Sequence, residues 1–328
     1  MSHASAAPTR RAPNLRLLLI SAVAAGLIGC AGHFWHAFQL RRNAAALLRR
    51  VERSLELGEQ TVAMTRLRQY LKLRPDDADQ QVRLAQLVDR TAQTRRQKEE
   101  ALQLYTLAIG FAPQNADLLR RRAELSYELQ RFAEAIRQVD DLLRKDPDDA
   151  GAVRVKALAL AAQARLAGET PGDRLAELFE RALKHSPGDV ELALELARIY
   201  RAQMPLAREG DRLHRGEKAS LADRVMTRLI EASPRSPEAY LARYQYREAY
   251  GLAGADDDLR QALAFDSQGK HLSVLIAAGL KQLAKGAAEQ ATAFFNRAIA
   301  AGVNNERGYL GLGRAHEAAG DRRAAQAA

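Results

Sequence analysis

The sequence predicts an all-α fold, a solenoid of helix-turn-helix repeats that follows one N-terminal transmembrane helix. One motif recurs along the chain: a small residue, an apolar residue four positions later, a small or apolar residue three further on, and a proline five beyond that. Hydrophobic residues make up 47% of the chain but aromatic residues only 5%, which favours alanine-rich helices over β-sandwiches and barrels. A fixed internal period of this kind indicates a repeat protein.

The motif is found five times with constant internal spacing. The copies are Ala63, Leu67, Tyr70 and Pro75; Ala101, Tyr105, Ala108 and Pro113; Ala135, Val139, Leu142 and Pro147; Leu175, Phe179, Ala182 and Pro187; and Ala222, Met226, Leu229 and Pro234. Proline cannot continue a helix and restricts the residue before it, so each copy closes a helix. Each repeat is therefore predicted to be an αα-hairpin of helices A and B, with the motif on helix B.

The first forty residues divide into a basic tail, residues 1–16, and an uncharged apolar run, residues 17–40. About 20 apolar residues in a helix cross a bilayer core, and Phe34, Trp35 and Phe38 lie near the end of the run, where interfacial aromatic residues belong. The run therefore predicts a transmembrane helix, or uncleaved signal anchor, in contact with the lipid bilayer. A cleaved secretory signal is the first alternative, although the run is longer than a usual signal core.

Cys30 is the only cysteine, and it ends a Leu-Ile-Gly-Cys segment that resembles a bacterial lipobox. Lipidation of Cys30 is therefore the second alternative, although the apolar residues after it are unlike the polar tether of a lipoprotein. His33 and His36 lie about one helical turn apart. Since the segment offers no further ligand, we interpret them as interfacial polar residues and not as a metal or haem pair.

The orientation of the predicted span is left open by the charges around it. Arginines precede the run and a larger number follow it, so the positive-inside rule alone would keep the repeats in the cytoplasm. Large domains can translocate despite such charge. We expect a single-pass membrane protein whose repeats lie in either the periplasm or the cytoplasm.

The repeats resemble the tetratricopeptide repeat, a 34-residue helix pair with the pattern W-x2-L-G-x2-Y, A-x3-F, P. Pro113 to Pro147 is 34 residues. Later matches are Leu275, Ala278, Gly279, Gln282, Gly286, Ala291, Phe295 and Ala298, then Tyr309, Leu312, Gly313, His316, Gly320 and Ala325. The resemblance covers about residues 44–328. It implies a right-handed superhelix of about seven and a half repeats over residues 41–328, the last one incomplete.

In this family the A helices line a concave groove that binds a protein or peptide partner. The resemblance implies that Arg120, Glu124 and Tyr127 of the third repeat and Leu194, Arg198 and Arg201 of the fifth line that groove. The carboxylate clamp of the chaperone-binding members is absent, because its places hold Leu48 with Glu52, Val82 with Gln86, and Arg120 with Glu124.

Helix A of the sixth repeat holds four of the nine tyrosines, all between Tyr240 and Tyr250. Tyrosine and arginine are the residue types that anchor many protein interfaces. Tyr240, Tyr244 and Arg247 are therefore further candidates for partner binding. The alternative is that these tyrosines fill the core between repeats.

Three of the intervals between the motif prolines are longer than 34 residues, at 38, 40 and 47. Because the motif itself keeps its spacing, the surplus is predicted to lie between helices A and B. It would form surface insertions at residues 92–99, 167–172 and 203–217.

The sequence carries no catalytic motif that we recognise, so the chain is predicted not to be an enzyme and to need no cofactor. Asp256, Asp257 and Asp258 resemble a metal cluster, but they precede a predicted helix, whose N-terminus acidic residues favour. The net charge of +10 suits anionic lipid or an acidic partner. No nucleic acid is expected, because the basic residues are spread over many helices without interleaved aromatic residues.

These features together favour a membrane-anchored scaffold that binds proteins through its concave groove. The chain stops at Ala328 within an alanine-rich helix, whereas a finished solenoid ends in a polar capping helix. The alternative is therefore the substrate-recognition region of a larger enzyme, or of an export or assembly machine, that continues beyond Ala328. An uncapped end would also allow self-association.

Overall fold

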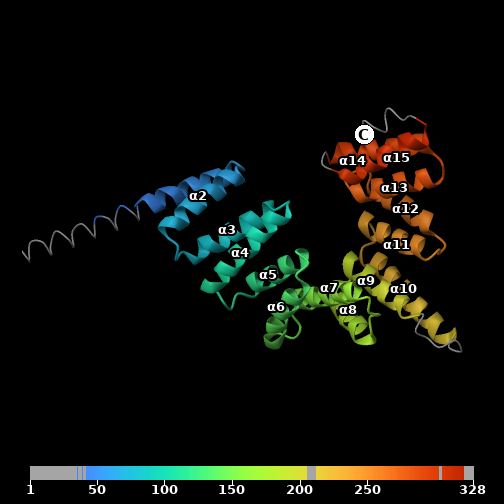
Figure 1. The fold of residues 1–328 in the computed structure, drawn as a ribbon, viewed down its shortest axis with the longest axis horizontal. Coiled ribbons are helices and arrows are strands. Elements are labelled where there is room, and N and C mark those ends of the chain that lie inside the picture. The colour runs from blue at the N-terminus through green and yellow to red at the C-terminus, as the bar shows by residue number, and fades with distance from the viewer. Residues whose placement is uncertain (1–34, 36–38, 40–41, 205–211, 303–304, 321–328) are drawn as a thin grey trace, which may run out of the picture. The chain divides into compact units, whose positions relative to one another are not determined.

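The computed structural model describes residue 35, residue 39 and residues 42–204, 212–302 and 305–320 of the chain, and their regular structure is helical (Figure 1). The predicted span at 17–40, including Cys30, lies outside the described residues apart from Trp35 and Gln39, so it stays a prediction. Among the helices that are described, none combines the length and apolar character needed to cross a bilayer.

The chain divides into two compact units after Leu118. In the first unit, residues 42–56 form a helix that is followed by α2 (Gln60–Leu73), α3 (Ala78–Thr91) and α4 (Arg95–Phe111). Helix α5 (Ala116–Glu128) crosses the division. The second unit continues through α6 (Phe132–Lys145), α7 (Ala150–Ala167), α8 (Asp173–His185), α9 (Val190–Ala202) and α10 (Arg212–Ala232). It ends with α11 (Pro237–Ala249), α12 (Ala255–Phe265), α13 (Leu272–Ala284), α14 (Ala288–Ala301) and α15 (Glu306–Ala318).

The helices of the second unit form two layers. From α7 onward each A helix packs on its own B helix, as α7 does on α8 and α11 on α12, and each B helix also packs on the A helix of the next repeat. Successive A helices also touch one another, α7 with α9, α9 with α11, α11 with α13, and α13 with α15. The A helices therefore form one continuous layer, which the B helices cover on one side.

A short turn with a repeated chemistry links one repeat to the next. Each motif proline ends helix B, and the residue two positions later caps the following A helix with its side chain. The caps are Asp77, Asn115, Asp149, Asp189 and Ser236, which accept a hydrogen bond from the backbone amide three residues on at 2.9–3.2 Å. Such caps satisfy amides that the first helical turn leaves without partners, so proline and cap together set the start of each repeat.

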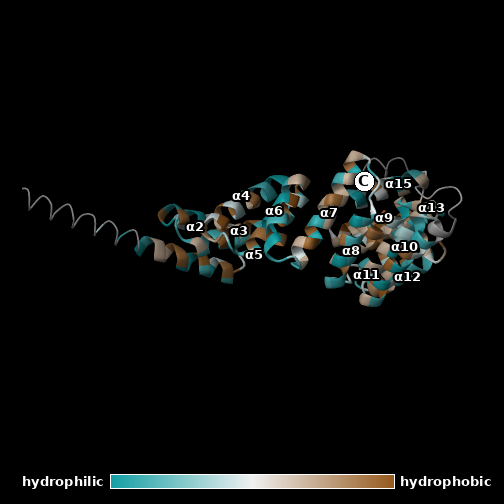
Figure 2. Cartoon of the chain, turned by 90° about the horizontal axis from the view of Figure 1, so that it is seen from below, coloured by the Kyte–Doolittle hydropathy of each residue, from teal (hydrophilic) through white to brown (hydrophobic). Residues whose placement is uncertain are grey.

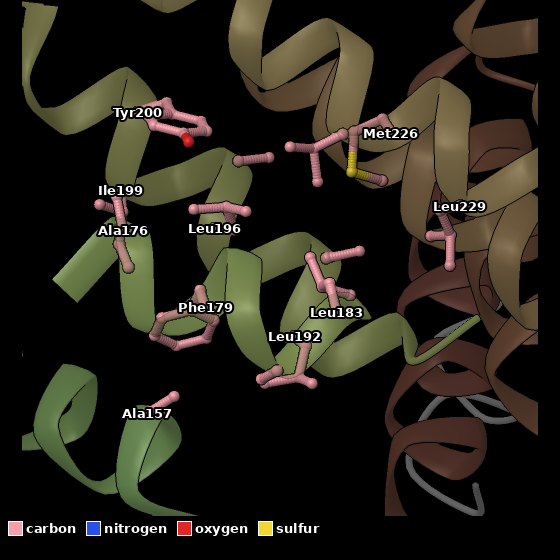
Figure 3. Close-up of a cluster of buried hydrophobic side chains, with 14 of the residues drawn as sticks. Ala157, Ala176, Phe179, Leu183, Leu192, Leu196, Ile199, Tyr200, Met226 and Leu229 are labelled. Carbon is pink, nitrogen blue, oxygen red and sulfur yellow. The ribbon is translucent and has the colours of Figure 1, made fainter. Parts of the chain in front are cut away.

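The recurring motif is the core of each hairpin, as the sequence predicts. In α8 and α10, Phe179, Met226 and Leu229 are at most 1% exposed and pack with Leu192 and Leu196 of α9 (Figure 3). One motif position differs, because Leu175 is only half-buried and its neighbour Ala176 takes the small place. Colouring by hydropathy shows that the helices carry both hydrophobic and hydrophilic residues, as helices packed on one side require (Figure 2).

In the second repeat the surplus residues lengthen a helix, so the insertion predicted at 92–99 is largely wrong. In the fourth repeat residues 168–172 of the predicted insertion do form a loop between helices A and B, and helix A is lengthened as well. Helix α4 has 17 residues against 14 in α6, and it starts at Arg95, inside the predicted insertion. Helix α7 has 18 residues against 13 in α9. In the fifth repeat, α10 begins at Arg212, so the last part of the predicted loop at 203–217 is also helical, while residues 205–211 lie outside the described residues.

Candidate protein-binding surface

The ninth residue of the A helix is exposed in four helices of the second unit and half-buried in α5. We call Glu124, Arg198, Gln245, Leu280 and Arg314 the ninth-position row; they belong to α5, α9, α11, α13 and α15. The Arg198 side chain is 50% exposed, Leu280 is 44% exposed, and Gln245 and Arg314 are exposed as well. In α7 the corresponding Leu158 is buried and interrupts the row. Because successive A helices from α7 to α15 touch, residues at one helical position follow one another across this layer.

The three candidates of the third repeat all take part in contacts within the second unit. Arg120 forms an ion pair with Asp149, the cap of α7, at 3.1 Å between Nε and Oδ2. Glu124 accepts a hydrogen bond from Arg121 at 2.8 Å. The Tyr127 hydroxyl donates to Glu191 of α9 at 2.9 Å. Arg120 therefore links the third repeat to the fourth, Tyr127 links the third to the fifth, and Glu124 is left as the member of the ninth-position row.

The candidates of the fifth repeat separate into one exposed and two packed side chains. Arg198 pairs with Glu195 of its own helix at 2.7 Å and points to solvent. Leu194 is half-buried against the core. Arg201 is only 10% exposed: it donates to the Tyr246 hydroxyl and to Asp223, each at 2.8 Å, and its guanidinium lies 5.0 Å from the Tyr250 ring centroid. Arg201 thus joins α9, α10 and α11.

The tyrosines of α11 fill the space between helices. Tyr244 and Tyr246 are 8% and 2% exposed, and the Tyr240 ring packs on Phe265 of α12 with centroids 5.5 Å apart. Tyr250 is 40% exposed. The placement of these side chains agrees with the core-filling alternative. Of the candidate residues on α11, Tyr240 and Arg247 are partly exposed.

A buried carboxylate holds Arg247 together with Arg243. Asp258 of α12 is 2% exposed and accepts from Arg243 Nη2 at 2.6 Å and from Arg247 Nη1 at 2.7 Å. Arg247 also donates to the Gly254 carbonyl at 3.1 Å. A buried charge is costly unless it is paired and hydrogen-bonded, and these contacts supply both. Arg247 therefore closes the α11–α12 hairpin.

The other two carboxylates of the acidic run also have cationic partners. Asp256 pairs with Lys281 at 2.7 Å and with Lys285 at 3.0 Å, and Asp257 pairs with Arg260. The Asp256 hydrogen bond is the largest cause of a raised pKa at Lys281. Over the described ranges, the structure contains no group of three or more histidine, cysteine or acidic side chains that could hold a metal ion.

Burial raises the pKa of several tyrosines in the second unit. It raises the pKa of Tyr200 to about 12, with the charge of Glu180 as the second cause. Burial also raises the pKa of Tyr127 and of Tyr246, with support from Glu191 and from a hydrogen bond to Asp223 respectively. These phenols stay protonated at neutral pH and act as hydrogen-bond donors between repeats.

A hollow lies where α7 extends beyond the length of the other A helices. It has a volume of about 710 Å³ and lies between the end of α7 and the start of α8. Its lining is mostly apolar and includes Leu160, Leu175 and Leu178, and Leu166 beside them is 79% exposed. Residues 168–172 of the predicted insertion form the loop between the two helices, and with the lengthened α7 they border this apolar recess.

Three members of the ninth-position row, Gln245, Leu280 and Arg314, are absent from the residues predicted from the sequence. Each A helix starts directly after its cap, so counting nine residues from that start would have found them. In α11 the tyrosines are the conspicuous candidates in the sequence, but they fill the packed face. The exposed face of the same helix carries the less conspicuous Gln245.

Comparison with known proteins supports the repeat assignment. The tetratricopeptide repeat family model matches residues 92–166. No curated protein matches the sequence. A tetratricopeptide repeat protein from Parabacteroides merdae ATCC 43184 has a similar structure, with a TM-score of 0.59 at 20% identity, and the match covers 83% of this chain and 98% of that one.

The human IFIT1 dimer with PPP-AAAA is a second similar structure, with a TM-score of 0.50 at 16% identity over 82% of this chain and 67% of that one. At these identities the likeness shows the fold alone. The described part of the chain is therefore an all-α array of tetratricopeptide-like hairpins, with the repeat itself matched over residues 92–166.

Proposed function

We propose that the chain is a membrane-attached, right-handed superhelical scaffold that binds an extended segment of a protein partner along its layer of A helices. The ninth-position row carries this proposal. The A helices touch from α7 to α15, and most of them leave one side chain exposed at the same helical position. A periodic row of this kind suits a partner whose own side chains repeat along an extended backbone.

The chemistry of the row suits a partner segment that mixes acidic and apolar residues. Arg198 and Arg314 offer guanidinium groups, and Leu280 offers an apolar contact between them in sequence. Leu310 of α15, which is 59% exposed, adds apolar surface near Arg314 along the helix. Arginine makes paired hydrogen bonds to carboxylates, so acidic side chains are the expected partners of Arg198 and Arg314.

The test is a quantitative binding measurement on the full chain after its partner has been captured by crosslinking. We expect Arg198→Ala, Leu280→Ala and Arg314→Ala combined to weaken partner binding at least about tenfold, because exposed arginine and leucine anchors are removed together. The matched control is Arg137→Ala, Arg224→Ala and Leu107→Ala, which removes the same residue types from exposed places on B helices.

Equal affinity of the folded triple variant and the wild type would rule out the row as the binding surface. A loss confined to the B-helix control would move the site to the opposite layer. Tyr244 and Arg201 are left out of the variant, because both are packed between helices and their loss would disturb the fold itself.

Attachment to the bilayer through residues 17–40 is part of the proposal and rests on the length and apolar character of that run. Retention of the full chain in neutral lipid vesicles after alkaline extraction is the expected result, and release into the supernatant would contradict it. Protease accessibility of the repeats in intact cells would then give their side of the membrane.

A further inference from the structure

The helix at residues 42–56 has an arginine face that the packing of the repeats does not use. Ala44, Val51 and Ser54 are at most 3% exposed and form its packed side. Arg42, Arg49, Arg50 and Arg53 are all exposed; we call them the arginine stripe. The helix is thus amphipathic in an unusual way, with small and apolar residues on one side and arginines on the other.

Helical geometry places these four arginines close together. At about 100° per residue, Arg42, Arg49 and Arg53 fall within about 40° of one another and Arg50 about 60° further round. Their Cα atoms span about 17 Å along the helix axis, at about 1.5 Å per residue. Three positive charges therefore lie along one nearly straight line, and the fourth, that of Arg50, lies to one side of it.

The stripe is not neutralised by neighbouring carboxylates. In residues 42–118 as described, no carboxylate forms an ion pair with a guanidinium of the stripe. Glu52, which lies on the same helix, is engaged by both terminal nitrogens of Arg83 on α3, one of them at 2.7 Å. Glu56 is exposed at the edge of the stripe and leaves a net positive face. Many other arginines in the described part of the chain do form ion pairs, including Arg68 with Glu100 in the same unit.

We infer that the arginine stripe binds the surface of an anionic lipid bilayer. A straight row of arginines on a helix suits a flat, negatively charged surface, whose phosphate groups accept hydrogen bonds from guanidinium at any point along the row. Clusters of four or more basic residues next to a membrane-spanning segment are attracted to anionic lipids in this way. The surface would hold the first repeat against the membrane.

A lipid surface fits better than a nucleic acid. Nucleic-acid sites commonly add aromatic side chains that stack on bases, and the stripe has none among its exposed residues. The choice of lipid rests in part on the proposed attachment through residues 17–40, which would bring this helix to the membrane. The exposed arginines themselves do not depend on that attachment.

The experiment uses the full chain with Cys30→Ser and a single new thiol, Ala46→Cys, which the helical geometry places between Arg42 and Arg53 on the stripe. The protein is reconstituted into vesicles of phosphatidylcholine alone or with phosphatidylglycerol. The rate of labelling by an uncharged, water-soluble maleimide is then measured. We expect labelling to be about fivefold slower in the anionic vesicles, because the stripe lies against their surface. Salt at about 1 M, where the Debye length is about 3 Å, should restore the faster rate.

The variant Arg42→Gln, Arg49→Gln, Arg50→Gln and Arg53→Gln should lose the dependence on anionic lipid. A control variant with the same change of charge alters exposed side chains elsewhere and should keep the dependence on anionic lipid. Its substitutions are Arg137→Gln, Lys184→Gln, Arg224→Gln and Arg235→Gln. Circular dichroism would check that both variants keep their helices.

Equal labelling in neutral and anionic vesicles would overturn the inference, and so would a four-glutamine variant that behaves like the wild type. Protection of the thiol by single-stranded RNA, but not by anionic vesicles, would assign the stripe to nucleic acid and overturn it as well. The proposed span at 17–40 and the proposed lipid contact of the arginine stripe are contradicted by different results. Loss of the chain from neutral vesicles contradicts the span at 17–40, whereas the stripe is judged by the salt-sensitive difference between lipids.

Discussion

Asp258 shows how a charged residue at one position of the motif changes the packing of a hairpin. It stands in the small place of helix B that Ala135 occupies in α6 and Ala291 in α14. On α11, Arg243 and Arg247 are the seventh and eleventh residues, the places of Leu196 and Tyr200 on α9. An apolar contact between helices is thus replaced by a buried carboxylate between two arginines.

We expect Asp258→Asn to destabilise the second unit by about 3–5 kcal/mol, because two largely buried guanidinium groups lose their counter-charge. The measurement is the urea midpoint followed by circular dichroism. Asp257→Asn is the matched control: this neighbour is 66% exposed and pairs with the exposed Arg260, so its loss should cost about 1 kcal/mol or less. Similar midpoints for the two variants would contradict the role of the buried ion triad.

A rescue variant tests whether the loss of stability in Asp258→Asn comes from the missing charge or from altered packing. Arg243→Leu, Arg247→Tyr and Asp258→Ala together restore the residue types of the other repeats. Replacing a buried ion group by apolar residues of suitable volume is often neutral or stabilising. The triple variant should therefore unfold at a urea midpoint near that of the wild type, well above that of Asp258→Asn.

At the scale of the helix, replacing glycine by alanine should lower the free energy of unfolding at one position and raise it at another. A Cβ on Gly279 of α13 would lie 2.7 Å from the Phe295 ring, which is fully buried, so Gly279→Ala should cost about 1–3 kcal/mol through overpacking. A Cβ on Gly110 of α4 would meet nothing within 4 Å, so Gly110→Ala should stabilise that helix by about 0.5–1 kcal/mol. Urea unfolding of each variant gives the sign, and stabilisation by Gly279→Ala would contradict the close approach of α13 and α14.

The helices themselves were largely predictable, because their signals are local. The small and apolar residues of each motif are core residues of helix B, and each proline with the cap two residues later marks a turn. The motif does not predict the early start of α4, because its residues lie only in the later part of helix B. Thr94 and Gln97 form a capping box there, and the spacing T-x-x-Q was visible in the sequence.

The candidate surface was less predictable, because exposure depends on contacts between distant residues. Tyr127 bonds to Glu191, 64 residues away, and Arg201 bonds to Tyr246, 45 residues away. A motif predicts that such side chains lie on helix A, but it does not predict whether they contact another repeat. Partner binding by the predicted residues stays a prediction, to which the exposed side chains of the ninth-position row are added.

For the whole molecule, the buried phenols predict a loss of stability in alkali. The pKa of Tyr200 is about 12 in the folded chain and 10.0 for an unperturbed tyrosine, so the unfolded chain ionises first. This contribution to stability is complete below about pH 10 and is lost as the pH rises towards about 12. The raised pKa values of Tyr127 and Tyr246 act in the same direction.

The check is the urea midpoint across that pH range together with the ultraviolet absorbance of phenolate. Tyr200→Phe should make the fall in midpoint shallower. Tyr250→Phe, a change at a residue that is 40% exposed, should leave the slope as it is. An identical pH dependence in wild type and Tyr200→Phe would exclude this phenol as a cause.

The location of the ion pairs also bears on how such a chain can grow by duplication. The Arg243–Asp258–Arg247 group is complete within one hairpin, α11 with α12, so a duplicated copy of that hairpin brings its own neutralising charges to any new neighbour. Arg120 and Arg154 instead reach the capping aspartates of the following repeats, Asp149 and Asp189. A single copy of the fourth repeat would keep these pairs, because that repeat carries both the capping Asp149 and Arg154. A single copy of the third repeat would instead place one arginine against Asn115, the uncharged cap of α5. The hairpins thus set different rules for lengthening the array over evolutionary time.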